Sequence, residues 1–298
     1  MRRPAPKVER VWTVLDLVQW GAEYFERKGV DSPRLTIELM LCEVLQVRRL
    51  QLYTDHERPL TSNELTSLRA FVHRRAEREP LQYILGMADF YGLTFQVNPS
   101  VLIPRPETEI LVERAIRHIK EVGGSVVRCL DIGTGSGCIA VSAAVHTPLS
   151  LWECIDVSAD ALAVAHQNAV DHSVGERLSY IQMDILEDIP KGPFDLVTMN
   201  PPYIPLIEIR ELEPEVRDHE PLNALTDDLD GLTFYRRFAE IVEQLVSDKG
   251  IALIEIGHGQ STDIREVFSA KGLHSSIIDD LSGVPRVLRI VVGGVTKW

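Results

Sequence analysis

The 298-residue sequence contains no apolar run of the roughly 18 residues that a membrane-spanning helix requires. Its four cysteines form no Cys-x-x-Cys pair, and its nine histidines form no cluster with metal-ligand spacing. These absences argue against a membrane span, a zinc module and a disulfide-stabilised secreted fold. We therefore expect no metal site and no membrane partner, and we expect the reducing cytoplasm as the location.

Basic residues are also scarce, because 31 Lys and Arg face 44 Asp and Glu, giving a net charge of −13. Residues 1–90 carry 14 basic and 13 acidic residues, which leaves 17 basic and 31 acidic residues in 91–298. An acidic C-terminal part is a poor partner for a phosphate backbone, so we expect no direct nucleic-acid binding. The basic start, Met1–Lys7, lacks an apolar signal core and predicts a short tail rather than a targeting peptide.

The glycine-rich turn after the apolar run 126–131 lacks the spacing of known phosphate-binding loops. Gly133, Gly135 and Gly137 follow Gly-x-Gly-x-Gly rather than the dinucleotide pattern, and no Lys-Ser/Thr pair completes a P-loop. The preceding Asp131 would repel a phosphate and favour a cationic ligand. Strand, turn and helix start are expected here, although a plain left-handed turn would also account for the glycines alone.

Two further expected strands are followed by acids. The run 151–156 ends at Asp156, which can accept hydrogen bonds from both ribose hydroxyls of a nucleoside. Ser158 can cap a helix over 159–169. The run 178–182 precedes Asp184, whose carboxylate could accept from an adenine amino group. One such acid is usually a cap or a solvated turn, but successive ones favour a ligand site at the carboxyl edge of a parallel sheet.

Residues 200–203, Asn-Pro-Pro-Tyr, end a fourth expected strand over 194–199. Two consecutive prolines cannot donate to a sheet, so a stiff loop must follow. The side-chain oxygen of Asn200 and the carbonyl of Pro201 are neighbouring acceptors, which suit a planar NH2 group with two donors. Tyr203 can pack on such a group. A proline turn with a polar cap is the simpler reading of an isolated Asn-Pro-Pro, but the neighbouring strand ends favour a binding site.

The remaining pattern predicts a helical N-terminal part and an α/β C-terminal part. Helical apolar spacing and start signals predict helices over 11–28, 31–47, 61–79, 107–120 and 231–247. A β-hairpin is expected over 86–97, a rigid connector over 99–106, a long loop over 204–230, a strand over 251–256 and an antiparallel pair at 277–278 and 287–292. Counting the strands gives a seven-stranded sheet with helices on both faces.

Several stretches carry a resemblance to a known family. The glycine-rich loop and the acids after it resemble class I S-adenosylmethionine-dependent methyltransferases. Residues 200–203 resemble the motif of members that methylate an amide or exocyclic amino nitrogen. Residues 80–86 (Pro-Leu-Gln-Tyr-Ile-Leu-Gly), 89–92 (Asp-Phe-Tyr-Gly) and 102–109 (Leu-Ile-Pro-Arg-Pro-Glu-Thr-Glu) resemble the PrmC/HemK family, the protein-(glutamine-N5) methyltransferases of peptide chain release factors. The similarity runs from about residue 10 to 292.

This resemblance implies a fold, a cofactor and a partner. The fold would be a mostly parallel, doubly wound, seven-stranded sheet with a small N-terminal helical bundle and a bridging hairpin. Residues 1–82 would form a substrate-docking domain, 83–106 the hairpin and linker, and 107–298 the S-adenosylmethionine-binding catalytic domain. The methyl group would go to the glutamine of the Gly-Gly-Gln loop of release factors. A bundle that only stabilises the fold is an equal alternative to one that docks the substrate.

The resemblance also assigns site residues. Asn200 and Pro201 would be catalytic, because their acceptors bind the attacking amide more strongly in the transition state. Pro202 and Tyr203 would join them in binding substrate, with Phe90 as a wall of the glutamine pocket unless it belongs to the hairpin core. The cofactor residues would be Asp131, Gly133, Thr134, Gly135, Ser136, Gly137, Asp156, Asp184, Ile185, Asn200 and Glu107, with Arg105 and Thr108 over the same pocket.

Four alternatives remain open at this stage. A sister family methylates a glutamine of a ribosomal protein, but it departs from the stretch Arg105-Pro106-Glu107-Thr108. DNA adenine methyltransferases share Asn-Pro-Pro-Tyr, yet they need a basic base-reading domain that no segment here offers. A non-catalytic nucleoside-binding module would not need the intact motif. A nicotinamide oxidoreductase would need a further spacer residue before Gly137.

Overall fold

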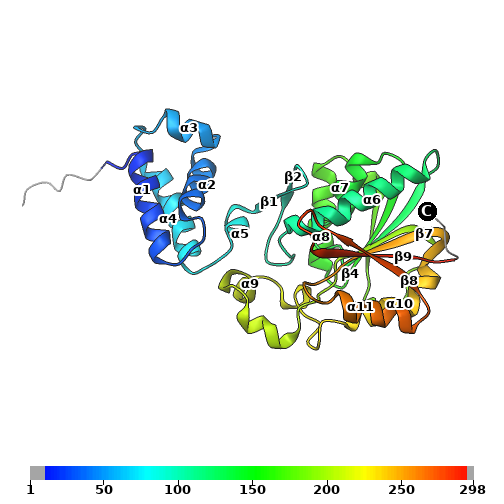
Figure 1. Ribbon diagram of the computed structural model, residues 1–298. Coiled ribbons are helices and arrows are strands. Elements are labelled where there is room, and N and C mark those ends of the chain that lie inside the picture. The colour runs from blue at the N-terminus through cyan, green and yellow to red at the C-terminus, as the bar shows by residue number, and fades with distance from the viewer. Residues whose placement is uncertain (1–10, 294–298) are drawn as a thin grey trace, which may run out of the picture. The chain divides into compact units, whose positions relative to one another are not determined.

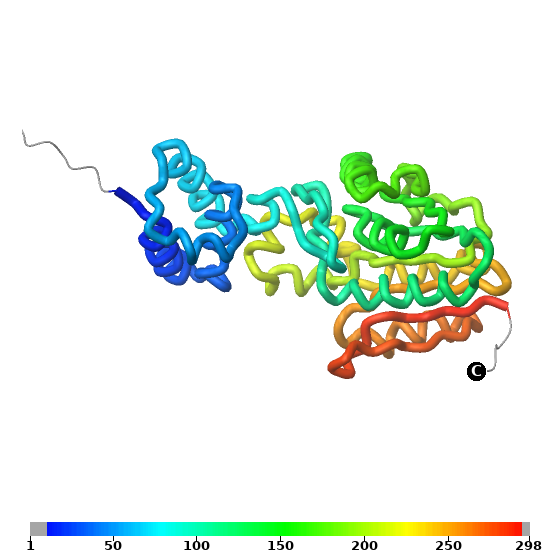
Figure 2. Tube along the Cα trace, turned by 90° about the horizontal axis from the view of Figure 1, so that it is seen from above, coloured from blue at the N-terminus to red at the C-terminus, as the bar shows by residue number. Residues whose placement is uncertain are grey.

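The computed structural model describes residues 11–293, so the expected tail at Met1–Lys7 lies outside the described residues. The chain divides into two compact units, Met1–Leu85 and Gly86–Trp298, here called the N-terminal and C-terminal units. The colour gradient in Figure 2 shows that each unit is built from one uninterrupted stretch of chain.

The N-terminal unit is a helical bundle. Its helices are α1 Val14–Arg27, α2 Pro33–Leu45, α3 Arg49–Thr54, α4 Ser62–Ala76 and α5 Leu81–Leu85. Helix α1 is capped by Thr13, whose hydroxyl accepts from the Asp16 amide in a capping box. The apolar stripe of α1 then buries Leu17 and Phe25 against the other helices. The three expected helices are confirmed, while the short helices α3 and α5 were not predicted because they span too few turns to show a period.

The C-terminal unit is built on a seven-stranded sheet. Its strands are β3 Val127–Ile132, β4 Ser150–Asp156, β5 Leu178–Gln182, β6 Phe194–Met199, β7 Val246–Glu255, β8 His274–Asp279 and β9 Pro285–Val291. Their order is β5-β4-β3-β6-β7-β9-β8. The pairs from β5 to β7 are parallel, and β9 runs antiparallel to both of its neighbours. The expected α/β fold with seven strands is therefore confirmed.

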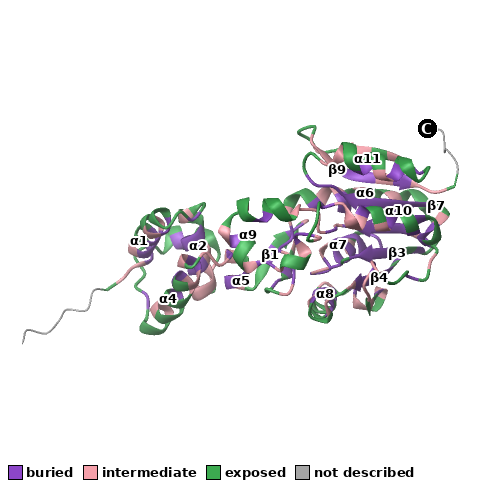
Figure 3. Ribbon diagram, turned by 90° about the horizontal axis from the view of Figure 1, so that it is seen from below, coloured by how far each residue is buried: buried purple, intermediate pink, exposed green. Residues whose placement is uncertain are grey.

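Helices cover both faces of this sheet (Figure 1). They are α6 Glu109–Val122, α7 Cys138–His146 and α8 Ala159–Asp171 on one face, and α10 Thr233–Leu245 and α11 Ser261–Ala270 on the other. Each layer encloses its own apolar cluster, around Trp152 and Leu111 on one side and around Tyr235 and Phe238 on the other. Figure 3 shows the central strands buried between helices whose outer sides are exposed. Because the helices cover the two faces of the sheet, the carboxyl ends of the parallel strands remain available to carry loops.

The expected hairpin is formed by β1 Met87–Phe90 and β2 Leu93–Gln96. Phe90 and Phe95 meet edge to face with ring centroids 6.0 Å apart, and both belong to the core on the α6–α8 side. Fully buried Asn168 of α8 holds the hairpin in place. Its amide oxygen accepts from the Gln96 N–H at 2.7 Å, and its NH2 donates to the carbonyls of Gln96 and Ser136. One side chain thus joins the hairpin to the glycine-rich loop.

Several segments of the C-terminal unit differ from the sequence-based expectation, which included no helix at α11 Ser261–Ala270. The region 204–230, expected to be loop, contains the short helices η3 Leu206–Glu211, α9 Pro214–His219 and η4 Leu222–Ala224. Each starts at or just after a proline and spans at most two turns, which is too short for a periodic pattern. Strand β7 also begins at Val246, earlier than the expected residue 251, because Val246 already pairs with Phe194 of β6 before a register shift to the pair Leu196–Ile251.

Asn168→Asp is expected to destabilise the C-terminal unit. The replacement puts an oxygen where the NH2 group donates, facing the carbonyls of Gln96 and Ser136. Two buried acceptors then lose their donor, at a cost of about 1–3 kcal/mol. Urea unfolding followed by circular dichroism measures the loss. Asn63→Asp makes the same chemical change at an exposed position and serves as the control; equal unfolding midpoints for the two variants would contradict this role.

Candidate active site

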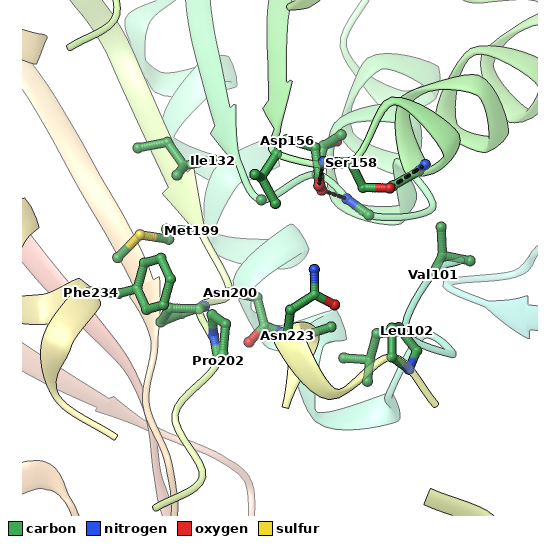
Figure 4. Close-up of a pocket in the computed structure, with 18 of the residues that line it drawn as sticks. Val101, Leu102, Ile132, Asp156, Ser158, Met199, Asn200, Pro202, Asn223 and Phe234 are labelled. Carbon is green, nitrogen blue, oxygen red and sulfur yellow. Dashed lines mark hydrogen bonds between the residues drawn. The ribbon is translucent and has the colours of Figure 1, made fainter. Parts of the chain in front are cut away.

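A cavity of about 400 Å³ lies at the carboxyl edge of the parallel strands. Its walls come from the ends of β3, β4 and β6 and from the loops that follow them, as expected for an open α/β sheet. Figure 4 shows Asp156 and Ser158 on one side of it, and Asn200 and Pro202 below them. Val101 and Leu102 lie across the cavity from Met199 and Phe234. The strand ends singled out in the sequence therefore meet at one place.

The glycine-rich loop that follows β3 lines the cavity. Gly133 and Gly135 have φ values of 67° and 55°, which residues with a Cβ rarely adopt. A Cβ on Gly137, at the start of α7, would come within 3.1 Å of the Ala165 Cβ. Gly137 itself does not line the cavity, and its part is to let α7 pack closely on α8. The Ser136 hydroxyl lines the cavity and is buried without a hydrogen-bond partner among the described residues.

Asp131 lies beneath this loop rather than in the cavity. Its carboxylate is fully buried and accepts from the hydroxyls of Thr134 and Thr198, both at 2.7 Å. Burial raises the pKa of Asp131 to about 6, and the two hydroxyl donors hold that pKa below what burial alone would give. The expected strand-end acid thus orients the loop and does not face a ligand directly.

Asp156, at the end of β4, does line the cavity. Its two oxygens accept from the amides of Gly135 and Ser158, both at 2.9 Å, which fixes the plane of the carboxylate. Burial raises its pKa, while these amide donors oppose the rise. Each oxygen keeps a second lone pair for a hydroxyl donor. Ser158 also caps α8 through the Ala161 amide, as the sequence predicts.

Asp184 and Ile185 complete the same wall. They follow β5, and the Asp184 carboxylate accepts from the Leu186 amide at 2.9 Å. The cavity lining contains four carboxylates, Asp156, Asp184, Asp227 and Asp228, and one guanidinium, that of Arg105. This balance disfavours a phosphate and favours a ligand that carries positive charge.

Asn200 and Pro201 lie at the opposite end of the cavity, directly after β6. The Asn200 NH2 group donates to the Thr108 hydroxyl at 3.3 Å, so the assigned amide turns its oxygen away from Thr108. Among the described residues, neither the Asn200 side-chain oxygen nor the Pro201 carbonyl accepts a hydrogen bond. Two adjacent acceptors are therefore available to a ligand, as the sequence predicts.

Besides Asp131 and Gly137, three expected site residues lie outside the cavity lining. Phe90 is 2% exposed and packs in the hairpin core, so the structure does not place it at the cavity. Glu107 is exposed and does not line the cavity, although its charge raises the pKa of Glu255. Tyr203 is half-buried behind the motif, with its hydroxyl donating to Glu255 at 3.3 Å. Its ring therefore faces the end of β7 and not the cavity.

Arg105 and Thr108, which were expected over the pocket, do line the cavity, and other residues there had little or no sequence signal. Arg105 pairs with the buried Glu220, which also accepts from the Ile103 amide at 3.1 Å. This pair joins two cavity-lining segments, 100–105 and 221–228, that are far apart in sequence. Asn223 lines the cavity from the segment 220–225, which resembles a family segment that helps close the site, whereas Asp227 and Phe234 lie where the sequence shows no recognisable motif. Glu255 could have been found, because it ends β7 at the same edge as the other strand-end acids.

This chain is similar in sequence to proteins of known family. A family described as PrmC N-terminal domain matches residues 16–86, and one described as methyltransferase small domain matches residues 108–209. The release factor glutamine methyltransferase of Chlorobaculum tepidum is 40% identical over 287 residues, covering 94% of this chain and 97% of that protein. This chain belongs to the release factor glutamine methyltransferase family. The family member from Geobacter sulfurreducens is 39% identical over 279 residues, covering 93% and 96% of the two chains.

A solved methyltransferase structure from Pyrococcus furiosus shares the fold. It is 17% identical with a TM-score of 0.50, and the match covers 68% of this chain and 91% of that one. Family members use S-adenosylmethionine as the methyl donor, and the cavity fits it. The acidic lining suits a sulfonium cation, Asp156 can hold ribose hydroxyls, and the buried Ser136 hydroxyl still lacks a partner. No helix among the described residues is long and apolar enough to cross a membrane, and those residues contain no cluster of metal-binding side chains.

Asp156→Ala is expected to weaken S-adenosylmethionine binding by about tenfold or more, since two charge-assisted hydrogen bonds are lost and the Gly135 and Ser158 amides lose their acceptor. Isothermal titration calorimetry measures the dissociation constant. The control is Asp160→Ala, which removes an exposed acid from the first turn of the neighbouring helix α8. Equal affinities for the two variants would show that Asp156 does not hold the cofactor.

Proposed function

We propose that this chain transfers a methyl group from S-adenosylmethionine to the side-chain amide nitrogen of the glutamine in the Gly-Gly-Gln loop of release factors. The relatives that match nearly its whole length are named for that glutamine methylation. The observation that carries the proposal is the pair of free acceptors, the Asn200 oxygen and the Pro201 carbonyl, at one end of the cavity. These two oxygens match the two N–H donors of a primary amide.

The weakness of the nucleophile explains the need for this pair. A glutamine amide nitrogen shares its lone pair with the carbonyl, so it is a poor nucleophile in the ground state. As the nitrogen attacks a methyl group it gains positive character, and its N–H groups become stronger donors. The oxygens of Asn200 and Pro201 therefore bind the transition state more strongly than the ground state. The alkylated amide is strongly acidic and loses its proton to water, so no side chain has to act as a base.

The other end of the cavity would hold the cofactor. When bound, S-adenosylmethionine supplies a methyl group on a positively charged sulfur. We assign the ribose hydroxyls to Asp156, the adenine amino group to Asp184 beside Ile185, and the methionine part to the loop from Gly133 to Ser136. Thr134 and Asp131 keep that loop in place through their hydrogen bond. Rigid placement of both reactants supplies much of the rate enhancement.

The N-terminal unit, we further propose, docks the release factor. The matched PrmC N-terminal domain covers this unit, which carries no residue of the described cavity. A docking unit would raise the local concentration of a substrate whose reactive loop is short. All four cysteines are free thiols, which is consistent with our proposal of a cytoplasmic location.

Methyl transfer from labelled S-adenosylmethionine tests the substrate assignment. A purified release factor is expected to take up the label, and the same factor with alanine in place of the Gly-Gly-Gln glutamine is expected to take up none. Duplex DNA and ribosomal protein serve as parallel acceptors. Label on either of these, with none on the release factor, would overturn the substrate while leaving the fold and cofactor in place.

Asn200→Ala is expected to abolish transfer to the release factor. The loss follows because one of the two acceptors for the amide disappears, while the residues that bind the nucleoside are unchanged. S-adenosylmethionine affinity is expected to stay within about tenfold, on the order of 1.4 kcal/mol. Single-turnover methylation and calorimetry separate the two effects. A variant that keeps substantial activity would refute the catalytic role of Asn200.

A further inference from the structure

Tyr203 of the Asn-Pro-Pro-Tyr motif is hydrogen-bonded to a buried carboxylate, that of Glu255 at the end of β7. Asn200 of the same motif ends the neighbouring strand, because Met199 of β6 pairs with Ile254 of β7. Glu255 is 2% exposed. Its Oε1 accepts from the Tyr203 hydroxyl at 3.3 Å, and its Oε2 is buried with no hydrogen-bond partner among the described residues. The Thr108 hydroxyl lies close enough to Glu255 to lower its pKa, and the same hydroxyl accepts from the Asn200 NH2 group. The methyl-transfer mechanism proposed above assigns no role to this carboxylate.

Tyr203 is held firmly between the motif and Glu255. Its carbonyl accepts from the Gln260 side-chain NH2 at 2.9 Å, while its hydroxyl donates to Glu255. A Cβ on Gly231 would lie 2.2 Å from the Tyr203 carbonyl oxygen, and one on Gly257 would lie 3.0 Å from the Tyr203 ring. Tyr203 therefore packs directly against the backbone of these two glycines, and its hydrogen bonds hold the far end of the proline loop.

Thr108 fixes the near end through the direction of its single proton. Thr108 is 2% exposed, so water does not supply its partners. Its oxygen accepts from the Asn200 NH2, so its own proton needs an acceptor, and the Oε2 of Glu255, which has no partner among the described residues, can supply one. An ionised carboxylate can only accept, and it therefore favours this arrangement. A neutral side chain at position 255 could instead donate a hydrogen bond to the Thr108 oxygen, and the Thr108 proton would then point toward Asn200. That proton would favour an Asn200 side chain rotated by 180°, with its oxygen toward Thr108 and its NH2 group in the cavity.

We propose that Glu255 is a positioning residue, whose ionised carboxylate acts through Thr108 and Tyr203 to keep the Asn200 oxygen facing the amide nitrogen of the substrate. This proposal rests on the proposed function. A flipped Asn200 would present donors to the donors of the glutamine amide and would lose the transition-state interaction. Glu255 touches neither reactant in this arrangement, and it acts only on the orientation of groups that do.

The surroundings of Glu255 make its charge sensitive to pH. Burial raises its pKa to about 7, against the lowering effect of the Thr108 and Tyr203 hydroxyls. The titratable and charged groups that act on it or feel its charge are Glu107 in the segment before α6, Tyr203 after β6, Arg286 on β9, Tyr235 on α10 and Cys138 on α7. Protonation below about pH 7 turns the acceptor into a donor, so the ordered arrangement is lost as pH falls.

Glu255→Gln tests the proposal because it keeps the size of the side chain and removes the charge. We expect kcat for release factor methylation at pH 8 to fall by about tenfold or more. The dissociation constant for S-adenosylmethionine, measured by calorimetry, is expected to change by less than about threefold. The acid limb of the kcat–pH profile near pH 7 is expected in the wild type and absent in the variant. Glu266→Gln, an exposed change on α11, is the control.

Thr108 variants provide the matched test of the relay. Thr108→Val removes the hydroxyl and is expected to lower kcat to a similar extent, and Thr108→Ser restores the hydroxyl and much of the rate. Adding Glu255→Gln to Thr108→Val is expected to cost much less than it does alone, because both changes interrupt one connection. Unchanged kcat in Glu255→Gln, an acid limb that persists in it, or a parallel loss of cofactor affinity would each overturn the positioning role. An inactive wild type would instead count against the proposed function.

Discussion

The buried carboxylate of Asp131 is the contact on which the site depends. It lies on the central strand β3 and accepts from Thr134 in the glycine-rich loop and from Thr198 on β6, two residues before Asn200. The loop assigned to the cofactor and the strand that carries the amide acceptors are thus fixed to one group. Burying a carboxylate is costly, as its raised pKa shows, and two short hydroxyl bonds compensate for part of that cost. Through these bonds, Asp131 holds the two halves of the site at a fixed distance from each other.

The chemistry of the two halves is matched to different ligands. The ends of β4 and β5 present carboxylates, which suit ribose hydroxyls, an amino group and a nearby sulfonium charge. The end of β6 presents neutral acceptors, the oxygens of Asn200 and Pro201. A carboxylate in their place would attract an amide too strongly in its ground state, whereas a neutral oxygen strengthens its interaction as positive charge develops. The negative charge on that side lies one layer further back, at Glu255, where it acts through Thr108 and Tyr203.

Strand ends were the part of the site that the sequence could predict, because a short apolar run followed by Asp or Asn gives a local signal. Asp156, Asp184 and Asn200 all reach the cavity on that basis. Local signals could not place Phe90, because an aromatic on a hairpin packs on whichever face is buried, and here that face meets the core beside Phe95. Arg105 and Glu220 are 115 residues apart and meet only in the folded chain, so no local sequence pattern predicts their ion pair. The short helices within 204–230 were not predicted either, since one or two turns are too short to show a periodic pattern.

The central claim is that the two oxygens after β6 hold the substrate amide. A crystal structure of this chain with S-adenosylhomocysteine and a Gly-Gly-Gln peptide would test it most directly. We expect the glutamine nitrogen about 2.7–3.2 Å from both the Asn200 Oδ1 and the Pro201 carbonyl oxygen, with the Asn200 NH2 group still bonded to Thr108. A glutamine amide bound through its oxygen, or one that contacts neither Asn200 nor Pro201, would contradict the account.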